Sequence, residues 1–175
     1  MSTVPVLRAL LRAALALPAP LARLRVGPPP VNDRGVALDE GVHRVVWLEN
    51  RVFGGITKGT PAAARAGMRR SVAIVAARPT APLDVRDTTA DGVPVRVYRP
   101  PGGPRPVLVW LHGGGWVQGD LATHDALCRR LAAEADRVVL AADYRLAPEH
   151  PFPEGLDDTL AVLRWARTHA GELGA

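Results

Sequence analysis

The sequence predicts an α/β fold in which a helical region precedes part of a sheet, and three observations support this. Residues 1–82 carry apolar residues at helical spacing, whereas the period changes to two from Leu83 onward. Two continuously apolar runs, 107–111 and 138–142, are typical of strands covered on both faces. A helical pattern follows each run, as in a parallel sheet with crossover helices. We therefore expect two domains, residues 1–82 and 83–175.

Composition and charge narrow the possible partners. The chain has 175 residues, 47% of them apolar, which suits a globular protein with a packed core. Residues 1–82 hold 12 basic against 4 acidic residues, but 21 of the 22 basic residues of the chain are arginines, scattered singly and without interleaved aromatics. This pattern argues against a nucleic-acid partner. Cys128 is the only cysteine, so we expect a packing residue, and the sequence predicts no metal site and no cofactor.

The first helix is expected near the N-terminus. Its apolar residues fall on one helical face, with the arginines off that face. Two prolines interrupt the segment, which is too short to span a bilayer and lacks the uninterrupted centre of a signal peptide. We expect a cytoplasmic protein whose first helix packs on its own chain, with peripheral membrane contact as the alternative. The face consists of Leu7, Leu10, Leu11, Ala14 and Leu15, and the prolines are Pro18 and Pro20.

Two further helices are predicted after the proline-rich break at 26–35. One begins near Asp39 and presents Val42, Val45 and Val46 as its apolar residues. The other begins at Thr60-Pro61, a capping residue followed by proline at the first helical position. Its apolar residues are Met68, Val72 and Val75, and it is expected to end before Arg78-Pro79.

A hairpin begins the second domain. Asp91-Gly92 separates two extended runs, which is a typical two-residue turn. Beyond the turn, three valines alternate with other residues, which predicts one buried face. Proline cannot donate to a ladder, so the pair is expected toward a sheet edge. The valines are Val93, Val95 and Val97, and the residues between and after them are Pro94, Arg96 and Tyr98.

Two strands and two helices complete the expected order. The strands at 107–111 and 138–142 should be neighbours in the sheet, each covered on both faces. Thr123 is expected to cap the helix between these strands, and the last helix should end near Gly171. The expected inward residues are Leu127, Leu131 and Ala135 in the first helix and Leu156, Leu160 and Leu163 in the second.

The segment HGGGW at 112–116 places three glycines directly after a stiff strand. Glycines allow a substrate to approach the main chain, so the backbone N–H groups form an array of donors. Neither dinucleotide-binding nor phosphate-cradle glycine spacing is present. An array of N–H groups beside an aromatic residue suits the oxyanion that develops during acyl transfer.

Together, HGGGW at 112–116 and DYRLAPEHPFP at 143–153 resemble the hormone-sensitive-lipase-like (family IV) esterases and lipases of the α/β-hydrolase fold. The resemblance implies that residues 83–175 form the N-terminal half of such a sheet and that residues 1–82 form a helical cap. It also implies a small acyl-ester substrate, although an amide or lactone hydrolase would carry the same motifs.

The resemblance implies a role for each motif residue. Backbone N–H groups of Gly113, Gly114 and Gly115 would form part of the oxyanion hole, with Gly114 and Gly115 as the preferred donors. His112 would orient this loop, and Trp116 would line the acyl or alcohol pocket. In the second motif, Tyr144 would form a pocket wall, whereas Asp143 and Arg145 would hold the loop. The remaining histidines are expected at helix ends or on the surface: His43, His124, His150 and His169.

No residue of the Ser/Asp/His triad is identified in the chain. The only serines, Ser2 and Ser71, lack the flanking glycines of a G-x-S-x-G elbow. The family pattern would place that elbow about ten to fifteen residues past Ala175. We therefore expect a fragment of a carboxylic-ester hydrolase that is inactive alone and that associates with itself through an exposed strand edge. The alternative is a non-catalytic ligand-binding or interaction module, the role that gibberellin receptors have on this fold.

Overall fold

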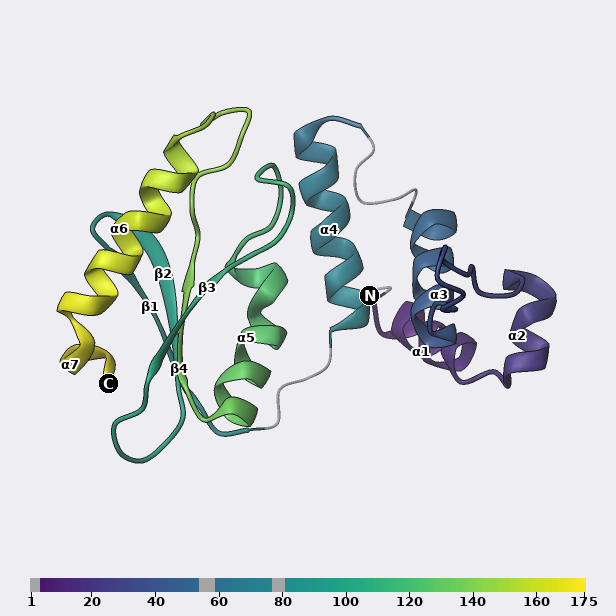
Figure 1. Ribbon diagram of the computed structural model, residues 1–175, viewed down its shortest axis with the longest axis horizontal. Coiled ribbons are helices and arrows are strands. Elements are labelled where there is room, and N and C mark those ends of the chain that lie inside the picture. Colours follow the sequence, from purple (N-terminus) through teal and green to yellow (C-terminus); the bar gives the residue numbers. More distant parts are fainter. Residues whose placement is uncertain (1–3, 54–58, 77–80) are drawn as a thin grey trace. The chain divides into compact units, whose positions relative to one another are not determined.

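The structure, a computed structural model, describes residues 4–53, 59–76 and 81–175. The chain divides into two compact units, Met1–Val75 and Ala76–Ala175. The N-terminal unit contains α1 (Val4–Leu15), α2 (Ala19–Val26), α3 (Glu40–Leu48), the π-helical turn η1 (Glu49–Phe53) and α4 (Pro61–Val75). The C-terminal unit contains β1 (Asp84–Ala90), β2 (Val93–Arg99), β3 (Val107–Leu111), α5 (Leu121–Ala135), β4 (Val138–Ala142), α6 (Glu154–Thr168) and α7 (Ala170–Leu173). Figure 1 follows this order by colour.

The three helices expected in the N-terminal unit are confirmed. The carboxylate of Asp39 accepts a hydrogen bond of 3.0 Å from the N–H of Val42, so Asp39 caps α3. The hydroxyl of Thr60 accepts from the N–H of Ala63 at 3.3 Å, and Pro61 is the first residue of α4. The helix ends at Val75, before the predicted Arg78-Pro79 stop, which lies outside the described residues.

The inward face of α3 differs from the prediction. Val42, Val45 and Val46 are all more than a third exposed. The side chain of Arg44 turns inward instead, because it donates to the backbone carbonyls of Leu15 and Leu17 at 2.9 and 2.6 Å. Those carbonyls lie at the end of α1 and just beyond it, where helical partners are missing. The hydrogen bonds of Arg44 thus fix the rotation of α3 about its axis, which differs from the rotation that the valine pattern predicted.

In the C-terminal unit, the hairpin has its expected turn. Asp91 and Gly92 both have positive φ, 48° and 84°, which matches the handedness of a two-residue hairpin turn. β1 and β2 pair antiparallel, and Ala90 is opposite Val93 at the end of the ladder next to the turn. β1 is the edge strand, and Pro94 lies just beyond the β2–β4 ladder, where its carbonyl accepts from the N–H of Asp143 at 2.9 Å.

The sheet has the order β1-β2-β4-β3, with β3 parallel to β4 and β2 antiparallel to it. All five residues of β4 are buried, as its continuous apolar run predicts. Within the described residues β3 pairs only with β4 and is the second edge strand, which matches the expected exposed strand edge. Its side chains are accordingly only partly buried, and Leu111 is exposed.

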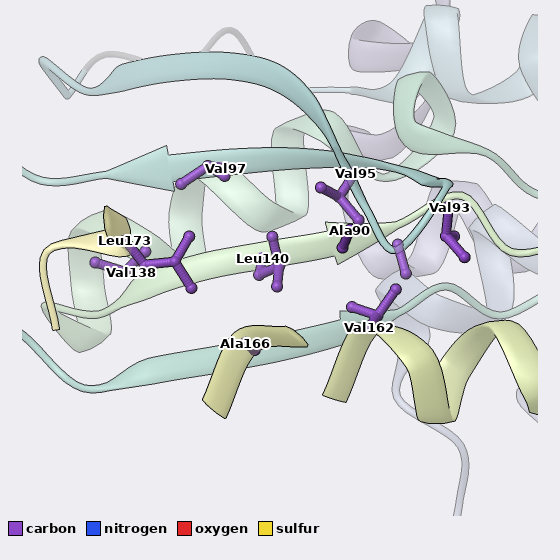
Figure 2. Close-up of a cluster of buried hydrophobic side chains, with 10 residues drawn as sticks. Ala90, Val93, Val95, Val97, Val138, Leu140, Val162, Ala166 and Leu173 are labelled. Carbon is purple, nitrogen blue, oxygen red and sulfur yellow. The ribbon is translucent and has the colours of Figure 1, made fainter. Parts of the chain in front are cut away.

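Helices cover both faces of this sheet. One core cluster lies between the sheet and helices α6 and α7, and Figure 2 shows its residues Val95, Val97 and Leu140 on the strands and Val162 and Ala166 on α6. The other cluster packs Tyr98 and Val139 against Cys128 and Ala132 of α5. Figure 1 shows α5 and α6 on opposite sides of the strands. The sheet is therefore the middle layer of three, as expected for an α/β protein.

The hairpin was predicted to bury one face, that of the valines, but Tyr98 on the opposite face is buried as well. Tyr98 is completely buried because α5 covers that face, and its hydroxyl donates to the carboxylate of Asp125 at 3.0 Å. Asp125 also accepts from Arg96 at 3.2 Å and from Arg129 at 2.8 Å. Burial, followed by the charge of Asp125, raises the pKa of the Tyr98 hydroxyl. The phenol of Tyr98 and the guanidinium groups of Arg96 and Arg129 thus share the carboxylate of Asp125.

The prediction of which leucines of α5 and α6 face inward is wrong in part. Leu156, Leu160 and Leu163 of α6 are each more than a third exposed, and Leu127 of α5 is also exposed. The buried residues of these helices are smaller: Asp158, Val162 and Ala166 in α6, and Thr123, Cys128 and Ala132 in α5. Small side chains allow a helix to lie close to the buried valines of the sheet.

Candidate active site

The two predicted motifs lie together at one edge of the sheet. β3 and β4 are parallel, and Leu111 is in register with Ala142, so the loops that follow both strands start side by side. Two hydrogen bonds join these loops. The hydroxyl of Tyr144 donates to the carbonyl of His112 at 2.6 Å, and the N–H of Ala147 donates to the carbonyl of Trp116 at 2.8 Å. The sheet therefore positions HGGGW and DYRLAPEHPFP as one structural element.

Glycine is required at specific positions of the first loop. Gly114 has φ +138°, and a Cβ atom there would lie 1.9 Å from the carbonyl oxygen of Gln118. Gly115 has φ +61° in open space. The carbonyl of Gly114 accepts from the N–H groups of Val117 and Gln118 at 3.2 and 3.1 Å, which closes the turn. The loop conformation thus depends on the absence of side chains at these positions.

The N–H groups of Gly113, Gly114 and Gly115 have no hydrogen-bond acceptor within the part of the chain that the structure describes. Gly113 and Gly115 are exposed, and Gly114 is half-buried. Backbone donors without a partner are uncommon unless they face solvent or a ligand. This loop therefore presents N–H groups that can donate hydrogen bonds to an anionic oxygen.

His112 is buried beneath this loop, with 4% of its surface exposed. Its Nδ1 lies 3.1 Å from the carbonyl oxygen of Gly113, and because a carbonyl only accepts, Nδ1 carries the proton. The imidazole stacks on Tyr144 with ring centroids 4.3 Å apart. No carboxylate within the described residues bonds to His112. Its contacts are with the backbone of the loop and with neighbouring rings.

His124 lies in the first turn of α5, as expected of a helix-terminal histidine, but it is not a surface side chain. It is half-buried, and its ring stacks on His112 with centroids 5.5 Å apart and lies 6.3 Å from Trp110. Burial, followed by the charge of His112, lowers the pKa of His124. The neutral ring thus extends the aromatic support of the loop. The sequence offered no signal for this role, since one histidine near a helix start is typical of caps.

The other three histidines do not stack on His112. His150 Nδ1 is 2.9 Å from the carboxylate of Glu154, and both side chains are exposed. His169 follows the last residue of α6 and stacks on Trp165 at 4.6 Å. His43 lies within α3 in the other unit.

Arg145 holds the second loop through a carboxylate that the sequence patterns did not indicate. Its Nη2 and Nε atoms donate to the carboxylate of Asp158 at 2.7 and 2.9 Å, and its backbone N–H donates to the same group at 2.9 Å. Burial alone would raise the pKa of Asp158, but the hydrogen bonds from Arg145 outweigh it and lower that pKa. Asp143 contributes its backbone N–H to Pro94. The aspartate on α6 has no local sequence signature, because its partner lies 13 positions away.

Asp120 is a further residue that sequence reasoning missed, because Thr123 was taken as the cap of α5. Asp120 is the true N-cap, and its carboxylate accepts from the N–H of Thr123 at 2.7 Å. The Thr123 hydroxyl accepts from the N–H of Asp120 at 2.9 Å, which completes a capping box. The spacing Asp-x-x-Thr after Gly119 is the signal that identifies this cap.

A cavity of about 410 Å³ adjoins the glycine loop. Trp116 forms one wall, with φ +58° and 73% of its surface exposed. Tyr144, expected to form a pocket wall, is buried against His112 instead of lining this cavity. The lining residues are Trp116, Arg145, Ala147, His150, Phe152, Gly155 and Leu156.

Known proteins are similar in sequence to most of this chain. A profile of the α/β-hydrolase fold matches residues 108–175. The carboxylic ester hydrolase LipN of Mycobacterium tuberculosis is 40% identical over 167 residues, which cover 91% of this chain and 44% of LipN. The chain has part of the α/β-hydrolase fold.

Other comparisons agree with this α/β-hydrolase assignment. The carboxylesterase NlhH of Mycobacterium tuberculosis is 46% identical over 116 residues, covering 63% of this chain and 36% of NlhH. The crystal structure of an esterase from the bacterial hormone-sensitive lipase family matches with a TM-score of 0.65 and 30% identity, covering 77% of this chain and 44% of the other. The predicted resemblance is confirmed, and this α/β-hydrolase chain spans less than half the length of these relatives.

Two structural features bear on other functions. The described residues contain no helix long and apolar enough to cross a membrane. In the same ranges, no group of three histidine, cysteine or acidic side chains is arranged to hold a metal ion.

Proposed function

We propose that this chain supplies the oxyanion loop and part of the substrate pocket of a carboxylic-ester hydrolase. The observation that carries the proposal is the set of backbone donors at Gly113, Gly114 and Gly115, which lack acceptors in the described part of the chain. Two parallel strands and a buried stack of rings hold these donors in place. The relatives LipN and NlhH are named as hydrolases of carboxylic esters.

The proposed role of the loop is to stabilise the tetrahedral intermediate of ester hydrolysis. The N–H groups of Gly114 and Gly115 would donate to the carbonyl oxygen of the ester as it gains negative charge. In enzymes of this kind, each such donor contributes about 3 to 4 kcal/mol to catalysis. His112 would keep the loop in position through its bond to Gly113, and Trp116 would border the acyl or alcohol group. Residues 1–82 would act as a helical cap.

The nucleophile is proposed to come from outside these 175 residues. Ser71 is 6% exposed, and its hydroxyl donates to Glu49 at 3.1 Å. Cys128 is completely buried, and burial raises the pKa of its thiol to about 12. A thiol in this state is not a nucleophile at neutral pH. We therefore propose that the 175-residue chain does not turn over esters by itself.

The competing proposal is a non-catalytic module that binds a ligand in the cavity beside Trp116. The buried state of Ser71 and Cys128 favours it, because a binding module needs no nucleophile. The two proposals make different demands on the gene downstream of codon 175. The hydrolase proposal requires a strand, a Gly-x-Ser-x-Gly elbow, and later an acidic residue and a histidine there.

The test compares the 175-residue chain with a chain extended through the downstream reading frame. The extended chain is expected to hydrolyse nitrophenyl butyrate, and replacing its elbow serine by alanine should abolish turnover while leaving the circular dichroism spectrum unchanged. The 175-residue chain is expected to show background rates. Turnover or a stoichiometric burst by the short chain would contradict its proposed inactivity. Unrelated coding sequence in every downstream frame would favour the binding module.

A further inference from the structure

The N-terminal unit contains an apolar cavity between the end of α1 and the helices α2 and α3, which we name the α2–α3 cavity. Its volume is about 360 Å³, within the range of about 300 to 1,000 Å³ typical of small-molecule sites. Ala22 at its floor is 4% exposed, whereas Leu21 at its edge is 54% exposed. The apolar lining residues are Leu15, Leu17, Leu21, Ala22, Val26, Trp47 and Leu48.

Arginines supply the polar lining of the α2–α3 cavity. Arg44 is largely buried, and it bonds to the carbonyls of Leu15 and Leu17 and to Glu40. Arg25 is exposed and has no ion-pair partner among the described residues. Its guanidinium can therefore bind a carboxylate in two parallel hydrogen bonds.

The charge around the α2–α3 cavity is positive. Within the described ranges, Glu40 is the only acidic side chain that forms an ion pair with an arginine at this cavity, and it pairs with both Arg23 and Arg44. Two arginines thus share one carboxylate, and Arg25 adds a further positive charge at the cavity. Residues 1–82 as a whole hold 12 basic and 4 acidic side chains. An anionic ligand gains from this field, whereas a cationic ligand is repelled.

We propose that the α2–α3 cavity binds an alkyl carboxylate, with the chain against the leucines and Trp47 and the carboxylate on Arg25. An uncharged alkyl chain would bury the same apolar surface but would leave Arg25 without a partner. A multiply charged small anion would gain from Arg25 but would leave the apolar walls empty. The combination of lining and charge selects a ligand with one anionic head and an alkyl chain. This proposal does not depend on ester hydrolysis.

Decanoate, used below its micelle concentration, is the probe, and isothermal titration calorimetry on the full 175-residue chain is the measurement. One decanoate is expected to bind per chain, and decanol is expected to bind more weakly. Arg25→Gln should raise the Kd for decanoate about tenfold or more, because a charge-assisted bidentate contact is lost. Arg34→Gln is the matched control, since Arg34 is exposed, carries the same charge and does not line the cavity.

A second pair of variants tests the apolar wall. Leu21→Asp places a carboxylate at the cavity edge and should abolish decanoate binding. Leu24→Asp makes the same change on the same helix at a position 82% exposed and outside the cavity, and it should leave binding intact. Both residues are exposed, so the helical content should stay constant by circular dichroism.

Three results would overturn the proposal. The first is no saturable binding of decanoate by the unmodified chain. The second is an equal loss of affinity in Arg25→Gln and Arg34→Gln, which would indicate a diffuse charge effect. The third is binding to phosphatidylglycerol vesicles without binding of free decanoate, which would indicate a membrane surface rather than a site for a single ligand.

Discussion

The three glycines after β3 differ in what an added methyl group would meet, and this difference predicts a ranking of alanine variants. At Gly113 the methyl group has open space and φ is not positive, so replacement should be neutral or stabilise the fold by about 0.5 kcal/mol through the unfolded state. At Gly115 the space is open but φ is +61°, so alanine should cost about 1 to 2 kcal/mol.

At Gly114 an added methyl group meets both a steric clash and an unfavourable backbone conformation. The new Cβ would lie 1.9 Å from the Gln118 carbonyl oxygen, which is backbone and cannot swing away, and φ is +138°. Overpacking costs about 1 to 3 kcal/mol and the backbone conformation a similar amount, so the free energy of unfolding should fall by about 3 kcal/mol or more. The loop would otherwise have to move away from β3.

Urea unfolding of the purified chain, followed by circular dichroism, measures this ranking. The order of stability is expected to be Gly113→Ala, then Gly115→Ala, then Gly114→Ala. Gly113→Ala is the internal control, because it adds the same methyl group to the same loop. If Gly113→Ala destabilises the protein as much as Gly114→Ala does, the loop does not have this backbone conformation, and the reasoning fails.

Three further predictions concern other parts of the C-terminal unit. The pKa of His124 is lowered from 6.5, so the unfolded chain binds more protons below that pH, and the free energy of unfolding should fall as the pH drops below 6.5. His124→Gln should flatten this slope in urea titrations, and a flat profile in the unmodified protein would contradict the shift. Cys128 should resist iodoacetamide at pH 8 until the protein is unfolded, because its pKa is about 12; rapid labelling of the folded chain would show that the thiol is accessible. Leu111→Lys, on the edge strand β3, should reduce self-association in sedimentation velocity, whereas Leu163→Lys on α6 should not, although both side chains are about equally exposed. Equal effects of the two lysines would argue against pairing through the strand edge.

The sequence predicted the order of elements well because the relevant signals are local. Asp91-Gly92 specifies its turn from two residues, and Thr60-Pro61 specifies a helix start in the same way. The continuous apolar run at 138–142 was sufficient to predict a fully buried strand. The two motifs were also placed correctly, since parallel strands bring the loops at their carboxyl ends to one edge of the sheet.

Rotation of the helices about their axes was predicted less well. In α6 the leucines outline one helical face, yet Val162 and Ala166 face the sheet. The choice depends on Asp158, whose bond to Arg145 places that side of α6 inward. Arg44 has the same influence on α3. Such pairings join residues that are distant in sequence, so hydrophobic periodicity alone does not contain them.

The candidate site shows the same division. HGGGW indicated a donor loop, and the structure leaves those donors without acceptors in the described part of the chain. The support beneath the loop was only partly foreseen. His124 and Tyr144 both stack on His112, but they come from α5 and from the loop after β4. A stack assembled from three segments leaves no pattern in any one of them.

The position of β4 between β2 and β3 has a consequence for biosynthesis. The hairpin is made first and β3 next, but neither pairs with the other in the final sheet, because each pairs with β4. During translation, both must therefore wait until residue 142 has left the ribosome. The apolar strand β3 is unpaired throughout this interval, and such segments are the ones that chaperones bind. β4, the strand that is buried most completely, is thus also the strand whose synthesis must finish before the sheet of the nascent domain can form.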